Sequence, residues 1–289
     1  MGVVATAEAL LEECHFEPER LPQAMEQAGR LLGFDYFCLV SADLERPTFI
    51  ASDEQRAGIA AYFSGGWAEV DYRARTEPHH PLGKVYLDHR AVSAGERKRS
   101  AVYNELYRPR NMSNYAGIRF DFNGEEWFCS ASRGESKGEI DGSEAGDFTR
   151  LARAAIKVAS LSARMQASRV DGMLEGLITS ETAAVILNHD GRVSSVTPAA
   201  ERLFGTDFGV RDRVLWSANA DDAAELAGLA LAARRIHGQT HRKSLLIRGR
   251  GRTHPVMLTA SHVLGAGLDE MPGARMLLIL SDLGRRDTL

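Results

Sequence analysis

Four stretches of the chain are expected to form α-helices: residues 7–32, 53–67, 144–178 and 221–236. In the first and third, hydrophobic residues recur every three or four positions, which predicts amphipathic helices, and the fourth is rich in alanine and leucine. The first is interrupted near Pro18 and ends at Gly33, since proline and glycine commonly interrupt or end helices. Asp53 stands at the start of the second stretch, where its carboxylate is expected to cap the helix.

Other stretches alternate between apolar and polar residues or are continuously apolar, which predicts β-strands. Residues 114–133 carry the clearest signal, because two alternating runs flank Asn123-Gly124, a pair typical of a tight hairpin turn. Residues 71–82 contain two prolines and two histidines and are expected to form a loop. The remaining strands are expected at residues 34–40, 48–51, 183–187, 192–196, 241–247, 254–263 and 275–280.

The order of these elements predicts an α+β chain of two domains, each with an antiparallel sheet. The first domain is expected at residues 1–143 and the second at 181–289, with a connector helix at 144–180. So long a helix with an apolar stripe suits a parallel contact with the same helix of a second copy, which predicts a homodimer. The stripe consists of Phe148, Leu151, Ala155, Ile156, Ala159, Met173, Leu174 and Leu177.

Composition narrows the class of protein. The chain has 289 residues, of which 44% are hydrophobic and 26% charged, as in ordinary globular proteins and unlike disordered or disulfide-stapled chains. It shows neither an apolar run long enough to cross a bilayer nor a basic leader at its start. Three widely spaced cysteines fit reduced thiols, so a cytoplasmic location is expected. A net charge of −4 does not suit a chain that coats nucleic acid.

Catalytic motifs are sparse. The sequence lacks a glycine-rich phosphate loop, an HExxH helix, a CxxC pair and a G-x-S-x-G turn. A metal site built from Asp88 and three histidines is an alternative, but neighbouring histidines point in different directions, so an exposed turn is favoured. These histidines are His79, His80 and His89. No catalytic residue, metal or cofactor is assigned.

An aromatic segment of the first domain is the candidate small-molecule site. Aromatic walls with a few placed polar groups are typical of binding pockets, although tyrosines at the rim of a core produce the same pattern. The candidate ligand-binding residues are Trp67, Asp71, Tyr62, Phe63, Tyr72, Arg73, Arg75, Tyr86 and Tyr103.

The residues of this segment leave the charge of the ligand open. Trp67 follows two glycines that let the backbone turn sharply, and Asp71 lies four residues further on. The Asp71 carboxylate would accept a hydrogen bond from a ligand N–H or attract a cation. Arg73 and Arg75 would prefer an anion, and on an extended loop they would point the same way.

The second domain resembles a PAS domain. The resemblance lies in the strand–turn–strand phrase at residues 184–193, the helical phrase Thr197–Gly205 and the closing strand Leu277–Asp282. The first domain resembles a GAF-like sensory domain in its order of helix, strand, hairpin and helix. The whole chain is similar to the sensory region of bacterial LuxR-type transcription regulators, on the phrases Gly66–Arg73 and Tyr103–Pro109.

This resemblance implies a ligand-sensing, dimerising regulatory region without catalytic activity. It implies that a small organic molecule in the first domain modulates a DNA-binding helix-turn-helix tail. That tail is expected to be missing after Leu289, either because the chain is truncated or because the natural protein lacks it. Acyl-homoserine-lactone receptors of this class have a similar Trp and Asp, but theirs is followed by Pro where this chain has Tyr72, so another ligand is an equal candidate. No membrane partner is expected.

Two other classes of function remain as alternatives. The histidine segment leaves open a metal- or His-dependent hydrolase. A ligand-free dimerisation scaffold is the other alternative. Whether the PAS-like domain binds a ligand stays open, because Leu215, Trp216 and Leu226 are large enough to fill its pocket.

Overall fold

The structure is a computed structural model that describes residues 2–43, 47–122, 124–234, 243–249, 254–263 and 274–284. The chain forms two compact units, one made by residues up to Ser162 and a second that begins at Ala163. This boundary falls inside α7 (Gly142–Thr179), so one continuous helix belongs to both units.

The first unit is built on a five-stranded antiparallel sheet with the order β2-β1-β5-β4-β3. Its strands are β1 (Tyr36–Ser41), β2 (Phe49–Ile50), β3 (Val85–Leu87), β4 (Asn114–Phe122) and β5 (Glu125–Arg133). The chain reverses between β4 and β5 at Gly124, whose φ of 80° suits glycine. Its predicted partner in that turn, Asn123, lies outside the described residues.

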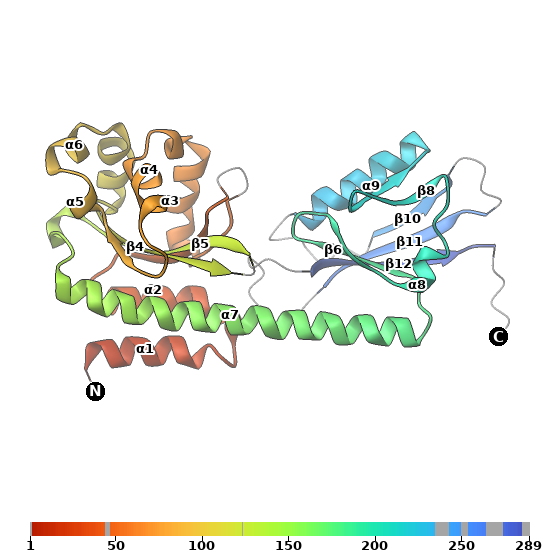
Figure 1. Cartoon of the computed structure of the whole chain (residues 1–289), viewed down its shortest axis with the longest axis horizontal. Coiled ribbons are helices and arrows are strands. Elements are labelled where there is room, and N and C mark those ends of the chain that lie inside the picture. Colours follow the sequence, from red (N-terminus) through yellow and green to blue (C-terminus); the bar gives the residue numbers. More distant parts are fainter. Residues whose placement is uncertain are drawn as a thin grey trace. The chain divides into compact units, whose positions relative to one another are not determined.

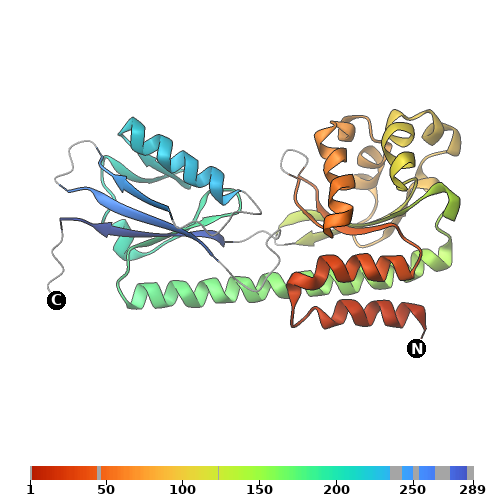
Figure 2. The same ribbon diagram turned by 180° about the vertical axis from the view of Figure 1, so that it is seen from behind.

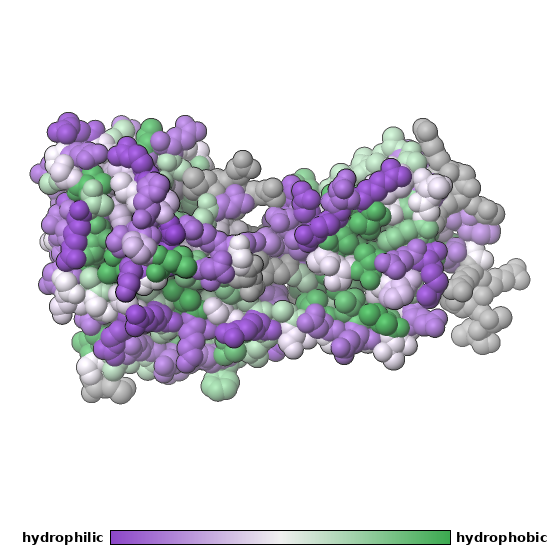
Figure 3. Space-filling view, in the orientation of Figure 1, coloured by the Kyte–Doolittle hydropathy of each residue, from purple (hydrophilic) through white to green (hydrophobic). Residues whose placement is uncertain are grey.

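Helices cover both faces of this sheet. Figures 1 and 2 show α2 and the first part of α7 on one face, and the helices from α3 to α6 on the other. Hydrophilic side chains coat α6, as Figure 3 shows. The helices are α1 (Val3–Glu13), α2 (Leu21–Leu31), α3 (Asp53–Ser64), α4 (Tyr72–Thr76), α5 (Asp88–Ala91) and α6 (Ala94–Arg99). Tighter turns are η1 (Pro18–Arg20), η2 (Trp67–Glu69), η3 (Glu77–His79), η4 (Tyr103–Tyr107), η5 (Arg108–Arg110) and η6 (Glu135–Lys137).

The core of the first unit lies between the sheet and the helices α2 and α7. Alternate residues of β1 and β5 turn large side chains toward this layer and are fully buried, among them Phe37, Leu39 and Trp127. Phe148 of α7 contacts the ring of Phe37 edge-on at 6.2 Å between centroids. This packing fixes the first part of α7 onto the sheet.

The apolar stripe of α7 therefore has two different environments. Phe148, Leu151, Ala155 and Ala159 are fully buried within the chain itself. The expectation that this part of the stripe meets a second copy was wrong, because the core of the first unit already occupies it. Further along the helix, Met173, Leu174 and Leu177 are only half-buried, and Ile178 is 44% exposed.

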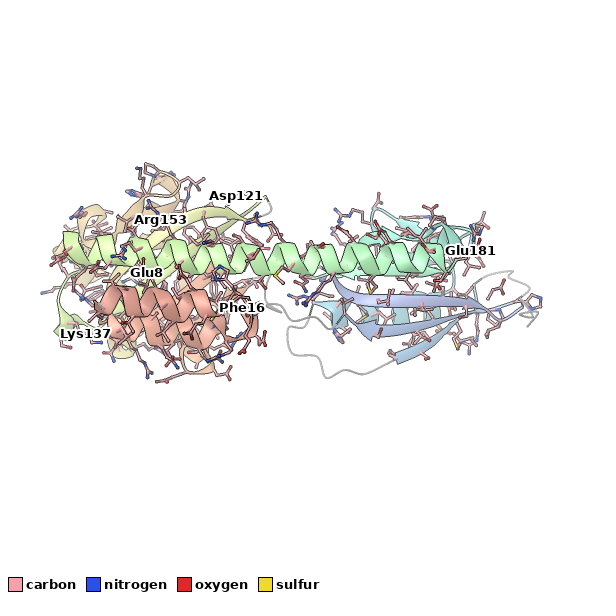
Figure 4. All side chains as sticks on the ribbon, turned by 90° about the horizontal axis from the view of Figure 1, so that it is seen from below. Glu8, Phe16, Asp121, Lys137, Arg153 and Glu181 are labelled. Carbon is pink, nitrogen blue, oxygen red and sulfur yellow. The ribbon has the colours of Figure 1, made fainter. Side chains whose placement is uncertain are left out.

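The outermost helix of the first unit is α1. It lies along α7, as Figures 1 and 4 show, and Glu8 accepts a hydrogen bond from Nε of Arg150 at 3.0 Å. Phe16, just beyond the end of α1, is 91% exposed (Figure 4).

The second unit has a five-stranded antiparallel sheet of its own, in the order β10-β11-β12-β6-β7. A hairpin of β8 and β9 and the helix α9 contribute Phe208, Leu226 and Leu229 to the core on this sheet. The elements are β6 (Ala184–Asn188), β7 (Val193–Val196), α8 (Pro198–Glu201), β8 (Phe208–Arg211), β9 (Val214–Ser217), α9 (Ala220–Ala233), β10 (Lys243–Ile247), β11 (Val256–His262) and β12 (Ala274–Asp282).

Both five-stranded sheets follow one topology. When the strands of each sheet are numbered in chain order, both read 2-1-5-4-3, with every neighbouring pair antiparallel. The predictions of an α+β class, a long helix and antiparallel sheets in two domains are confirmed. Among the described helices, none has a stretch long and apolar enough to cross a membrane.

Some local predictions were wrong. Ser52, and not Asp53, caps α3, because its side chain accepts the hydrogen bond from the Gln55 N–H. Residues 71–82 contain the helix α4 and the turn η3 and are not a plain loop, since the Asp71 side chain caps α4 by accepting from the Arg73 N–H. The strand β3 and the β8–β9 hairpin were missed, because runs of three or four residues carry too little periodicity.

Candidate functional site

A cavity of about 360 Å³ opens in the first unit, on the face of the sheet opposite Phe37 and Trp127. Its floor is formed by alternate residues of two neighbouring strands, which point to one face because side chains alternate along a strand. The register pairs Tyr36 with Ser132, Cys38 with Ser130, and Val40 with Phe128, and all six line the cavity.

Small side chains on this face leave the space. Cys38, Ser130 and Ser132 are the small members of the floor, beside the larger Tyr36, Val40 and Phe128. On β4, a Cβ at Gly117 would overlap the carboxyl oxygen of Glu77. Gly117 therefore provides the room in which the Glu77 carboxyl lies.

The walls come from α3, from the segment of α4 and η3, and from the residues around η4 and η5. Apolar groups predominate on them. One end of the cavity, the polar end, is formed by the buried ionisable side chains of Asp71, Arg73 and Glu77. The remaining lining residues are Ser41, Ala42, Ile59, Tyr62, Phe63, Asp71, Arg73, Ala74, Glu77, Pro78, Tyr107, Met112, Tyr115 and Glu126.

Asp71 is 4% exposed and its carboxylate is held by three donors. One oxygen accepts the hydroxyls of Tyr107 at 2.7 Å and Tyr62 at 2.9 Å. The other accepts the backbone N–H of Arg73 at 2.9 Å. All three donors are neutral groups of the chain itself. Burial, reinforced by the charge of Asp71, raises the pKa values of both tyrosines, so both hydroxyls stay protonated donors.

Arg73 is 4% exposed, and its charge is matched inside the protein. Its Nη2 and Nε donate to one oxygen of Asp88 at 3.0 and 3.2 Å. Nη2 also donates to the carbonyl of Met112 at 2.8 Å. The guanidinium carbon lies 3.8 Å from the ring centroid of Tyr107 and 4.6 Å from that of Tyr115.

Glu77 is the third buried ionisable group at the polar end. It is 6% exposed and accepts a hydrogen bond from the Tyr115 hydroxyl at 2.8 Å. Burial raises the pKa of the Glu77 carboxyl to about 8. The carboxyl is therefore mostly protonated at neutral pH, and a small change in its surroundings is enough to move its proton.

Cys38 on the floor is a thiol and not a thiolate. Burial alone raises its pKa to about 12, which makes it a poor nucleophile at neutral pH. The three cysteines of the chain, Cys14, Cys38 and Cys129, are all buried and unbridged.

Four of the nine residues predicted for a site line the cavity, namely Tyr62, Phe63, Asp71 and Arg73. The others lie outside its lining. Tyr72 and Tyr103 are buried in a small apolar cluster with Val102 and Leu106, and Trp67 packs against that cluster. The Tyr86 hydroxyl lies 2.6 Å from Oγ1 of Thr76, and its ring contacts Tyr115 edge-on.

The two arginines do not share one direction. They lie on the helix α4 and not on an extended loop, so a spacing of two residues separates them around the helix axis. Arg73 points into the protein, whereas Arg75 is exposed and pairs with Glu96 at 3.2 Å. The inference that both would hold one anion was therefore wrong.

Glu77, Tyr107 and Tyr115 were not among the predicted site residues. Tyr115 stands on the alternating pattern of β4, so its face follows from the sequence once the strand is placed. For Glu77, in a segment rich in turn-forming residues, no comparable signal exists in the sequence.

The histidine segment does not converge on a metal. Within the described residues, no group of three His, Cys, Asp or Glu side chains is arranged to hold a metal ion. Asp88 is fully buried, where it accepts from Arg73 and from the backbone N–H of Tyr115 at 3.2 Å. The His80 ring contacts Tyr86 edge-on.

In the second unit, the residues expected to fill a pocket have separate roles. Leu215 and Leu226 are buried members of the core. Trp216 is half-buried, with the guanidinium carbon of Arg211 3.3 Å from its ring centroid.

No protein-family model and no curated protein matches the sequence. Among solved structures, the chain is similar to the crystal structure of the E.coli DhaR(N)-DhaL complex at 12% identity, over 97% of this chain and 90% of that one, with a TM-score of 0.24. So low a score carries no conclusion about fold or function.

Proposed function

We propose that this chain is the ligand-sensing region of a regulatory protein and that its first unit binds a small organic molecule in the cavity between the β1–β5 face and α3. The observation that carries the proposal is the cavity itself. Its volume of about 360 Å³ falls in the range of small-molecule sites, and apolar walls with a few buried polar groups are typical of them.

The sequence resemblance supports the regulatory part of the proposal. A PAS-like second unit and a GAF-like first unit fit the sensory region of a bacterial LuxR-type transcription regulator that acts in the cytoplasm. In such a regulator, a ligand acts by favouring one of two states of the protein. The helix α7, shared by both units, is the element through which a change around the cavity would reach the second unit.

We propose binding without catalysis. Two observations support this: Asp71 and Arg73 at the polar end are held by internal partners, and Cys38 on the floor is a protonated thiol. None of them is presented as a free nucleophile.

Dimerisation is the second part of the proposal. The half-exposed apolar residues Met173, Leu174 and Leu177, with Ile178, support a contact between the second halves of two α7 helices. Sedimentation of the Leu174→Glu variant, whose charge would lie on that face, tests this part. A dimer mass in the parent that falls to a monomer mass in the variant is expected, and a monomeric parent overturns it.

A thermal-shift screen of small metabolites tests the ligand site. Compounds that raise the melting temperature of the parent should fail to do so for Ala74→Phe, which fills the cavity from α4. The matched control is Ala101→Phe, at an exposed position outside the lining, and it should respond like the parent.

Mass spectrometry of each binding compound after incubation separates a sensor from an enzyme. An unchanged mass is expected. Turnover of the compound would overturn the claim of binding without catalysis, and a screen without any binding compound would overturn the ligand site.

A further inference from the structure

Resting on the proposed function, we infer that the cavity takes an organic cation, with an ammonium head group held between the buried carboxyls of Asp71 and Glu77 and an apolar body lying along the floor of Cys38, Val40 and Phe128. The inference comes from which charges at the polar end already have a partner of opposite charge and which do not.

The positive charge at the polar end is already matched. Among the described residues that line the cavity, Arg73 is the single basic one, and Asp88 pairs with it at 3.0 Å. Arg97, next to this pair, lies 3.9 Å from Asp88 and also pairs with Glu139. Neither arginine offers an uncompensated charge to an anionic ligand.

The carboxyls of Asp71 and Glu77 differ from the two arginines, because their hydrogen-bond donors are uncharged groups. Asp71 accepts from two tyrosine hydroxyls and a backbone N–H, and Glu77 accepts from the Tyr115 hydroxyl. Within the part of the chain that the structure describes, neither carboxyl has an ion pair with a lysine or arginine. In a buried site of low dielectric, a cation placed there is attracted and an anion is repelled.

Aromatic rings surround the same end. Tyr62 and Tyr107 stack at 6.4 Å between centroids, and Tyr115 lies beside Glu77. The guanidinium of Arg73 already lies over the rings of Tyr107 and Tyr115, which shows that these tyrosines accept a cation on their faces. Ammonium groups are bound in this way by aromatic side chains.

The Glu77 proton makes the ligand charge measurable. Titratable or charged groups surround this carboxyl on the elements packed against it: Tyr62 on α3, Asp71 and Arg73 around α4, Tyr86 on β3, Asp88 on α5, Tyr115 on β4 and Cys129 on β5. Burial and the two aspartates raise the pKa of Glu77 to about 8, although the Tyr115 hydrogen bond and Arg73 lower it. A bound cation lowers this pKa and releases a proton at pH 7, whereas a bound anion raises it and retains the proton.

Three compounds with the same indole ring test the inference: tryptamine, its alcohol analogue tryptophol, and indole-3-propionate. Titration calorimetry at pH 7 in two buffers of different ionisation enthalpy gives the affinity and the number of protons released. We expect tryptamine to bind at least about tenfold more tightly than either of the other two compounds, a difference of about 1.4 kcal/mol or more in binding free energy. Its binding should also release up to one proton.

The Glu77→Gln variant should lose the proton release and most of the preference for tryptamine. The matched control is Glu105→Gln, which removes an exposed carboxyl outside the cavity and should behave like the parent. Persistence of the proton release in Glu77→Gln overturns the assignment to this residue.

The other outcomes separate this inference from the proposed function. Equal binding of the three compounds, or tighter binding of indole-3-propionate, overturns the cation and leaves the ligand site in place. Failure of all three while neutral or anionic compounds bind in the thermal-shift screen has the same meaning. Failure of all three together with an empty screen overturns both.

Discussion

Replacing Glu77 by glutamine should change how the stability of the first unit depends on pH. The pKa of the Glu77 carboxyl is about 8 in the folded protein, against an ordinary value of 4.5. Between these two values the folded chain keeps a proton that the unfolded chain has lost. The free energy of unfolding therefore falls as the pH rises from about 4.5 to 8, and the group contributes no further change outside that window.

The size of the effect follows from the shift. Each pKa unit corresponds to about 1.4 kcal/mol, so Glu77 lowers the free energy of unfolding by about 5 kcal/mol across the window. Glutamine does not ionise. The loss of the hydrogen bond between the Glu77 carboxyl and the Tyr115 hydroxyl changes the free energy of unfolding by an amount that is the same at every pH. Relative to the parent, Glu77→Gln should gain about 5 kcal/mol between pH 4.5 and 8.5.

Urea unfolding at pH 5, 7 and 9, followed by tryptophan fluorescence, measures this difference. Trp67 and Trp127 both lie in the first unit and report on it. Glu105→Gln, at an exposed carboxyl, should run parallel to the parent at all three pH values. A constant difference between Glu77→Gln and the parent would refute the reasoning, because Glu77 would then ionise in the folded protein as it does in water.

Two further predictions concern the packing of each unit. Leu151→Ala should destabilise the first unit by about 2–5 kcal/mol in urea unfolding without changing the mass in sedimentation, because Leu151 is fully buried within the chain. Leu174→Ala, at a half-buried position, should cost less than about 1 kcal/mol. Equal effects of the two would contradict the different environments of the two halves of α7. Gly191→Ala should destabilise the second unit by at least about 2 kcal/mol, since Gly191 has a φ of 69° and a Cβ there would overlap the carbonyl of Ala230. The control Gly228→Ala, in an open position of α9, should be neutral or stabilise the unit, and a melting curve of each variant decides this.

The elements that could be predicted from sequence are those with long, regular patterns. The hairpin of β4 and β5 follows from two alternating runs around Asn123-Gly124, and α7 follows from a stripe that extends over many turns. The strand β3, of three residues, has no pattern of its own and exists because it pairs with Ala116, Gly117 and Ile118 of β4.

The candidate site was predicted in its neighbourhood and not in its geometry. The aromatic segment drew attention to Tyr62, Phe63, Asp71 and Arg73, all of which line the cavity. The roles of Asp71 and Arg73 differ from those expected, because Asp71 accepts a hydrogen bond from Tyr107 and Arg73 forms an ion pair with Asp88. Such partners lie 36 and 15 residues away in the chain, and spacing along the sequence does not bring them into view.

The sequence by itself determined the alternation that places Cys38, Ser130 and Ser132 on one face of their strands and Phe37 and Trp127 on the other, because the direction of a side chain in a strand depends only on its position. Tertiary structure alone decided that β1 pairs with β5 and that α3 and α4 cover the face that carries Cys38, Ser130 and Ser132. It likewise decided that the buried half of the α7 stripe packs on its own sheet. Periodicity states that a face is to be buried, whereas the surface that buries it depends on contacts between residues far apart in the chain.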